Sequence, residues 1–178
     1  MYILLTILGI IAGIIVVLLV LALFTKKGYS VHREIVINKP NQEVFNYVKY
    51  IRNQDNYSKW VMTDPNMKKE FKGTDGTVGF IYGWNGNKQA GEGEQEIKTL
   101  NNGERVDTEI RFVRPFAAVA YADMLLTPAS GNQTHVRWGM ASSMKYPMNV
   151  MLLFMNMDKL LGKDLDTSLN TLKGILEK

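Results

Sequence analysis

The N-terminal segment of the chain limits the possible folds most strongly, because no side chain from Tyr2 to Phe24 carries a charge. A helix of about 23 residues, rising about 1.5 Å per residue, would reach about 35 Å. The hydrocarbon core of a bilayer is about 30 Å thick, so the segment predicts one transmembrane helix. It is apolar on all sides and too long to be the core helix of a domain of this size.

A cleaved signal peptide is the competing interpretation of the same segment. Against it, the apolar stretch is longer than a typical signal core, no basic region precedes it, and no small-x-small cleavage site follows Leu23. We therefore expect residues 1–28 to be a transmembrane anchor with a short basic linker. The protein would then lie in the cell membrane as a single-pass protein, with the membrane as a partner through residues 2–24.

The residues within and just after this segment bear on orientation and self-association. Lys26 and Lys27 follow the span directly, so the positive-inside rule favours a cytoplasmic location for the rest of the chain. Gly9 and Gly13 form a Gly-x-x-x-Gly pair that could let two such helices approach closely. Because glycine is common in membrane-spanning helices, this pair predicts weak self-association at most.

The remaining 150 residues or so, 29–178, have the usual size of one domain with one core. After the first 28 residues, 19 basic residues stand against 17 acidic ones, a net charge of +2. That balance argues against a nucleic-acid partner. The absence of cysteine excludes disulfides, thiolate metal sites and cysteine nucleophiles, and leaves the redox compartment open.

Residue patterning in this part predicts an α+β fold. A β-branched segment at 29–37 predicts a strand, and Pro40 opens a helix that a second short helix at 53–60 follows. From 67 to 144, glycine- and asparagine-rich turns separate about six antiparallel strands, of which 105–112 alternates most clearly. Apolar residues then recur every three or four positions from Pro147 to Glu177, which predicts a long amphipathic helix packed in a curved sheet.

Several short motifs follow this order of elements, and together they resemble one family. They are Ile37-Asn38-Lys39-Pro40 with Val44-Phe45, Gly91-Glu92-Gly93, Phe112-Val113-Arg114-Pro115-Phe116, Val136-Arg137-Trp138-Gly139-Met140, and Phe154-Met155-Asn156-Met157-Asp158-Lys159 with Gly162. Over about 29–178 the chain resembles the START-like (SRPBCC) superfamily, and within it the polyketide cyclase/dehydrase-like proteins. The resemblance implies a helix-grip fold whose hydrophobic cavity, between sheet and long helix, holds apolar molecules such as lipids or polyketides. Members include enzymes and carriers, so the fold leaves the activity open.

We expect the wall of that cavity to be the candidate binding site. Its predicted residues are Tyr82, Trp84, Thr108, Phe112, Trp138, Met140, Met144, Met151 and Met155. The competing interpretation is that each is an ordinary core residue. Six of the ten methionines fall between Met140 and Met157, and flexible thioethers suit irregular apolar ligands.

Candidates for catalysis are few. Both histidines, His32 and His135, fall on predicted solvent-facing strand faces, and His32 with Glu34 makes only two metal ligands, so no metal site or cofactor is expected. Asp123 is the weak catalytic candidate: facing inward it would have a raised pKa and Thr108 as a polar partner, whereas facing outward it is simply solvated. The outward position is favoured because buried acids are rare unless paired.

These observations favour a membrane-anchored binding module for a small hydrophobic ligand, lipid-like or polyketide-like. The alternatives are a cyclase- or hydrolase-type enzyme that acts on such a ligand, and a protein-interaction scaffold.

Overall fold

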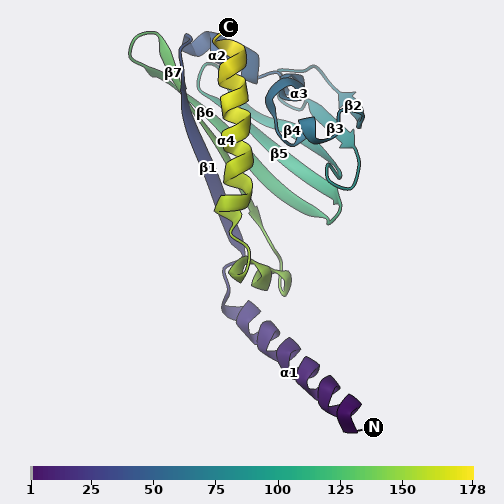
Figure 1. Cartoon of the computed structure of the whole chain (residues 1–178). Helices are drawn as coiled ribbons and strands as arrows, with labels where there is room; N and C mark the ends of the chain where they lie inside the picture. The colour runs from purple at the N-terminus through teal and green to yellow at the C-terminus, as the bar shows by residue number, and fades with distance from the viewer. Residues whose placement is uncertain (1) are drawn as a thin grey trace.

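The computed structural model describes residues 2–178, and its order of elements is the α+β order predicted from the sequence (Figure 1). An apolar helix, α1 (Tyr2–Phe24), precedes seven strands, two short α-helices, three short 3-10 helices and a long C-terminal α-helix. The strands are β1 (Gly28–Ile37), β2 (Lys68–Lys72), β3 (Ile81–Asn85), β4 (Glu92–Asn101), β5 (Arg105–Arg114), β6 (Ala118–Ala129) and β7 (Gln133–Ser143). The other helices are α2 (Asn41–Val48), η1 (Ile51–Asn53), α3 (Gln54–Tyr57), η2 (Val61–Thr63), η3 (Met148–Leu153) and α4 (Met157–Leu176).

The strands form one antiparallel sheet in the order β1-β7-β6-β5-β4-β3-β2. Its curved inner face holds α4, which runs beside β1 in Figure 1. The predicted helix-grip fold is therefore confirmed. Alternation along the strands sets the two faces: in β5, Val106, Thr108 and Ile110 are buried, and the acidic residues between them lie on the outer face.

One end of the sheet lies beside α1, because α1 leads directly into β1, and we call it the α1 end. Neighbouring strands run antiparallel, so alternate connections meet at this end. It comprises the start of β1, the β3–β4 connection at 86–91, the β5–β6 connection at 115–117, and the end of β7. The opposite end carries the β6–β7 turn at 130–132. The main core cluster joins the inner face of the sheet to α2 and α4, and it includes Val44, Trp138 and Leu165.

The C-terminal helix begins later than the sequence suggested. Instead of one helix from Pro147, the chain forms the separate 3-10 segment η3, and α4 starts only at Met157. The physical reason is a cap: Asn156 has an extended backbone, and its side chain accepts a hydrogen bond of 2.8 Å from the Lys159 N–H. Asn156 was therefore the available sequence signal for this boundary.

Helix α1 extends away from the sheet at the lower end of Figure 1. It is long and apolar enough to cross a membrane. Of its residues only Ala22 is buried, and Gly9 and Gly13 have open space around them. The helix thus contributes almost nothing to the core of the rest of the chain.

Candidate functional site

A cavity of about 290 Å³ lies between the inner face of the sheet and the segment 54–67, and α4 contributes Leu161 to its lining. Most of its lining is apolar or aromatic, and polar side chains lie at its two ends. The lining residues are Gln54, Ser58, Trp60, Val61, Thr63, Met67, Tyr82, Trp84, Gln89, Ala90, Gln95, Ile110, Phe112, Arg114, Pro115, Ala122, Trp138, Met140 and Leu161. Ligand cavities in proteins usually measure about 300–1,000 Å³, so this one suits a small molecule.

The mouth of the cavity lies at the α1 end of the sheet. Gln89, Arg114 and Pro115 are the solvent-exposed members of its lining, and they belong to the β3–β4 connection, the end of β5 and the β5–β6 connection. The side chain of Arg114 donates hydrogen bonds to Glu92 and Asn85, which fixes its position at the rim. A molecule would therefore enter from the side of the protein on which α1 lies.

Aromatic rings form the walls. Trp84 and Phe112 meet edge to face, with ring centres 5.9 Å apart, and Trp60 meets Trp138 in the same way. Gly93 lies between Trp84 and Phe112 in the strand register, and a Cβ there would overlap the Trp84 ring. Only glycine lets the indole cross β4 to reach Phe112, which explains part of the Gly91-Glu92-Gly93 motif.

The inner end is polar but uncharged. Gln54 and Gln95 are buried there, and the Gln95 amide nitrogen donates a hydrogen bond of 2.9 Å to the Thr108 hydroxyl. A second void of about 10 Å³ adjoins this end and is lined by Tyr57, whose hydroxyl has no hydrogen-bond partner among residues 2–178. Burial raises the pKa of the Tyr57 hydroxyl, so it stays a neutral donor.

Tyr82 is the one phenol in the wall of the main cavity. Its hydroxyl donates a hydrogen bond of 2.6 Å to Asp55, and Asp55 in turn pairs with Lys69 at 2.7 Å. Burial raises the pKa of Tyr82, and the bond to Asp55 raises it further. The Tyr82 hydroxyl is therefore held as a structural donor and is poorly suited to act as an acid or base.

The structure brings together five of the nine residues expected in the cavity wall: Tyr82, Trp84, Phe112, Trp138 and Met140. Thr108 lies one step away, in the lining of the small void. Met144, Met151 and Met155 lie outside the lining, and this part of the prediction was wrong. The prediction placed Met144 on the last strand, but β7 ends at Ser143. It placed Met151 and Met155 on one helix from Pro147, whereas the chain between β7 and α4 forms a connection at the α1 end, outside the cavity lining.

Asp123 and the two histidines lie outside the cavity. Asp123 is on the outer face of the sheet, where its carboxylate pairs with Arg137 at 2.8 Å. His135 also faces outward, with its Nε2 3.2 Å from Glu34, and His32 is exposed. Among the described residues that line the cavity, only Tyr82 and Arg114 have ionisable side chains, so the structure offers Asp123 no catalytic role there.

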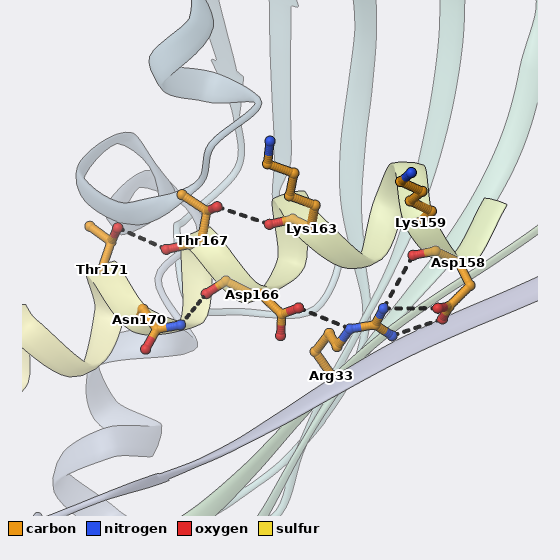
Figure 2. Close-up of a pocket in the computed structure, with 8 residues that line it drawn as sticks. All are labelled: Arg33, Asp158, Lys159, Lys163, Asp166, Thr167, Asn170 and Thr171. Carbon is orange, nitrogen blue, oxygen red and sulfur yellow. Dashed lines mark hydrogen bonds and ion pairs between the residues drawn. The ribbon is translucent and has the colours of Figure 1, made fainter. Parts of the chain in front are cut away.

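Sequence reasoning missed Arg33, which lies on the inner face of β1 and reaches α4. Figure 2 shows its guanidinium between Asp158 and Asp166, at 2.8 and 3.0 Å, in an open depression along the helix. Gly162 makes room for this group, since a Cβ there would overlap it. The hydrogen bonds from Arg33 hold the pKa of Asp158 below its ordinary value. Lys159 and Lys163 point away from Arg33. We therefore interpret the ion pairs of Arg33 with Asp158 and Asp166 as structural contacts that hold α4 against β1.

Comparison with known proteins identifies the fold. No family model matches the sequence, and no curated protein matches it significantly. Among solved structures, norcoclaurine synthase from Thalictrum flavum is 11% identical, with a TM-score of 0.62 over 87% of this chain and 89% of that one. Ara h 8.0201 is 13% identical, with a TM-score of 0.53 over 84% and 97% of the two chains.

A structural-genomics protein from Chromobacterium violaceum is 12% identical, with a TM-score of 0.56 over 84% of this chain and 97% of that one. At such low identities the likeness concerns the arrangement of the backbone and carries no activity from one protein to another. From Gly28 onward, the protein therefore has a helix-grip fold, which it shares with these three proteins.

Proposed function

We propose that this protein is a membrane-anchored binding module for a small hydrophobic ligand. The observation that carries the proposal is the position of the cavity: an aromatic-walled space whose mouth opens at the sheet end next to a helix of membrane-spanning length. An apolar molecule partitions into the bilayer, so an anchor that keeps the mouth near the bilayer shortens its path to the site.

The lining defines the class of ligand. Aromatic side chains on several sides of the cavity favour a ligand with a flat aromatic or alicyclic ring system, because edge-to-face and stacked contacts are most favourable with planar surfaces. Gln54 and Gln95 at the inner end favour one neutral polar group, such as a hydroxyl or carbonyl. The volume of about 290 Å³ favours a small cyclic molecule over a two-chain lipid. We thus narrow the expectation to the polyketide-like end of the range, in keeping with the resemblance to polyketide cyclase/dehydrase-like proteins.

Energy transfer from tryptophan tests the binding proposal, because Trp60, Trp84 and Trp138 all line the cavity. Titration with the neutral fluorophore N-phenyl-1-naphthylamine, on the protein without residues 1–25, should give saturable transfer from tryptophan to the probe. Ala122→Leu should weaken the signal, because Ala122 lines the cavity and the larger side chain would take up part of its space.

Ala118→Leu is the matched control, because Ala118 lies on the same strand and is exposed. It should bind the probe as the unaltered protein does, with near-UV circular dichroism to verify the fold of both variants. No saturable transfer, or equal transfer in the Ala122→Leu and Ala118→Leu proteins, would refute the ligand site.

The anchor and its orientation are part of the same proposal. Lys26 and Lys27 at the end of α1 support a cytoplasmic location for the cavity. Because the chain has no cysteine, a Ser130→Cys variant has a single thiol, in the exposed β6–β7 turn. In intact cells it should resist a membrane-impermeant maleimide and react after lysis, while the protein stays in the membrane fraction under alkaline carbonate. Labelling in intact cells would show that the predicted orientation is wrong, and release of the protein by carbonate would refute the anchor. Weak self-association through Gly9 and Gly13 stays a prediction of the sequence.

A further inference from the structure

The connection between β7 and α4 carries an exposed apolar surface that the cavity and the core leave unexplained. Its exposed residues, which we call the η3 surface, are Tyr146, Met148, Met151, Leu153 and Phe154. Phe154 is 74% exposed, far more than a core residue would be. The surface holds two of the six methionines from Met140 to Met157, and no acidic residue occurs from Met144 to Met157. A cluster of this kind commonly marks an interaction site.

Hydrogen bonds tie this connection to the end of α1. Asn149 is fully buried, and its side-chain nitrogen donates to the carbonyl oxygens of Ala22, at 2.7 Å, and Thr25, at 2.9 Å. The Met144 N–H donates to the carbonyl oxygen of Lys27 at 2.8 Å. The last carbonyls of a helix have no partner within the helix, so Asn149 caps α1 from a point more than a hundred residues later in the chain.

This cap fixes where η3 must lie. Ala22 is the one buried residue of α1, and it is covered where η3 packs against the last turn of the helix. In Figure 1 the yellow-green turns of η3 lie beside the upper end of α1. If α1 spans the bilayer, its last turn lies at the boundary between acyl chains and headgroups, and η3 lies at the same depth.

We propose that the η3 surface rests in the headgroup–acyl boundary of the bilayer and seats the cavity-bearing part of the protein on the membrane. The proposal goes beyond the proposed function but rests on its membrane-spanning α1. The chemistry suits this depth: exposed Tyr146 and Phe154 provide aromatic side chains, and Lys26, Lys27 and Lys145 provide cations for anionic headgroups. Short apolar segments held in the interfacial plane bury their side chains about 5–10 Å into this boundary.

A consequence concerns the cavity. Its mouth lies at the α1 end of the sheet, where η3 also lies, so the docked protein would hold the mouth close to the membrane surface. Phe116, exposed in the β5–β6 connection beside the mouth, lies at the same end and would provide a second apolar contact. A flexible tether alone would leave the direction of the mouth free.

Site-specific quenching in nanodiscs tests the proposal on the full chain, which has no native cysteine. Four single-cysteine variants would carry an NBD label: Leu153→Cys and Phe154→Cys in the η3 surface, Ile11→Cys in α1, and Ser130→Cys at the opposite end of the sheet. All four positions are exposed in the structure, so the labels should leave the fold intact. The nanodiscs contain phosphatidylcholine with phosphatidylglycerol, hold one protein copy each, and include lipids with a nitroxide either near the headgroup or deep in the acyl chain.

We expect the deep nitroxide to quench the label at 11, the shallow nitroxide to quench the labels at 153 and 154, and neither to quench the label at 130. If 153 and 154 are quenched no more than 130 while 11 is quenched, the anchor stands and interfacial docking is overturned. If the label at 11 also escapes quenching, both the anchor and the docking are overturned. An emission shift at 153 and 154 without lipid quenching would indicate a protein contact and would likewise overturn the membrane contact.

Discussion

Leu165→Ala should destabilise the protein strongly, because Leu165 lies on the side of α4 that faces the sheet and is 0% exposed. Buried leucine-to-alanine substitutions lose about 2–5 kcal/mol, as a transfer term plus a term for the space left behind. Leu169 and Leu172 continue the same buried stripe of α4 into the main core cluster, so little mobile structure is available to fill the gap. We therefore expect a loss of about 3–5 kcal/mol in the free energy of unfolding.

Urea unfolding followed by tryptophan fluorescence measures this loss, on the protein without residues 1–25. With a slope of about 2 kcal/mol per M urea, typical of proteins of this size, the midpoint should fall by about 1.5–2.5 M. Leu160→Ala removes the same atoms from the same helix, but Leu160 is 52% exposed, so its effect should stay within about 0.5 kcal/mol. Equal midpoint shifts for the two variants would refute the assignment of the buried face of α4.

Three further expectations follow from the same contacts. Deletion of residues 1–25 should leave a soluble, folded monomer by size-exclusion chromatography, because the main core cluster, within residues 2–178, includes no α1 residue; aggregation would contradict this. Trp138→Ala should lower the free energy of unfolding by about 3–5 kcal/mol, because Trp138 packs edge-on against Tyr57. It should also weaken probe binding, because Trp138 lines the cavity. No change in stability or binding would mean that the position of Trp138 is wrong. Arg33 lowers the pKa of Asp158, so the stability from this pair is complete above about pH 4 and is lost as the pH falls through the lowered pKa. Arg33→Met should therefore weaken the acid dependence of the free energy of unfolding, measured by urea titration at several pH values. An unchanged pH dependence would argue against the pair.

Local pattern was enough to predict the elements that depend on near neighbours in the chain. The charge-free run from Tyr2 to Phe24 predicted α1, and the alternation around Thr108 predicted β5 together with its buried face. Leu165 fell on the buried stripe of a helix through its spacing alone, and it is fully buried. In each case the period of the side chains, two in a strand and 3.6 in a helix, is a property of the backbone that sequence reports directly.

The start of α4 and the positions of the late methionines were wrong because the pattern continued through a break. Apolar residues occur at helical spacing on both sides of Asn156, but the cap at Asn156 ends one segment and begins another. Periodicity measures which residues share a face, and it is insensitive to a change in chain direction between two segments of similar composition. Met151 and Met155 therefore lie in the connection at the α1 end and not in the expected cavity wall.

Tertiary structure alone decided the site and the contacts that position it. That Trp84 crosses Gly93 to meet Phe112, that Arg33 passes under Gly162 to reach Asp158, and that Asn149 caps α1 all depend on residues far apart in sequence. Sequence composition determined that the chain has an apolar anchor-length helix and an α+β core of one domain's size. Which side chains enclose the cavity, and toward which end it opens, depended on strand order and register, because these bring distant residues within contact distance and leave no periodic signal in the chain.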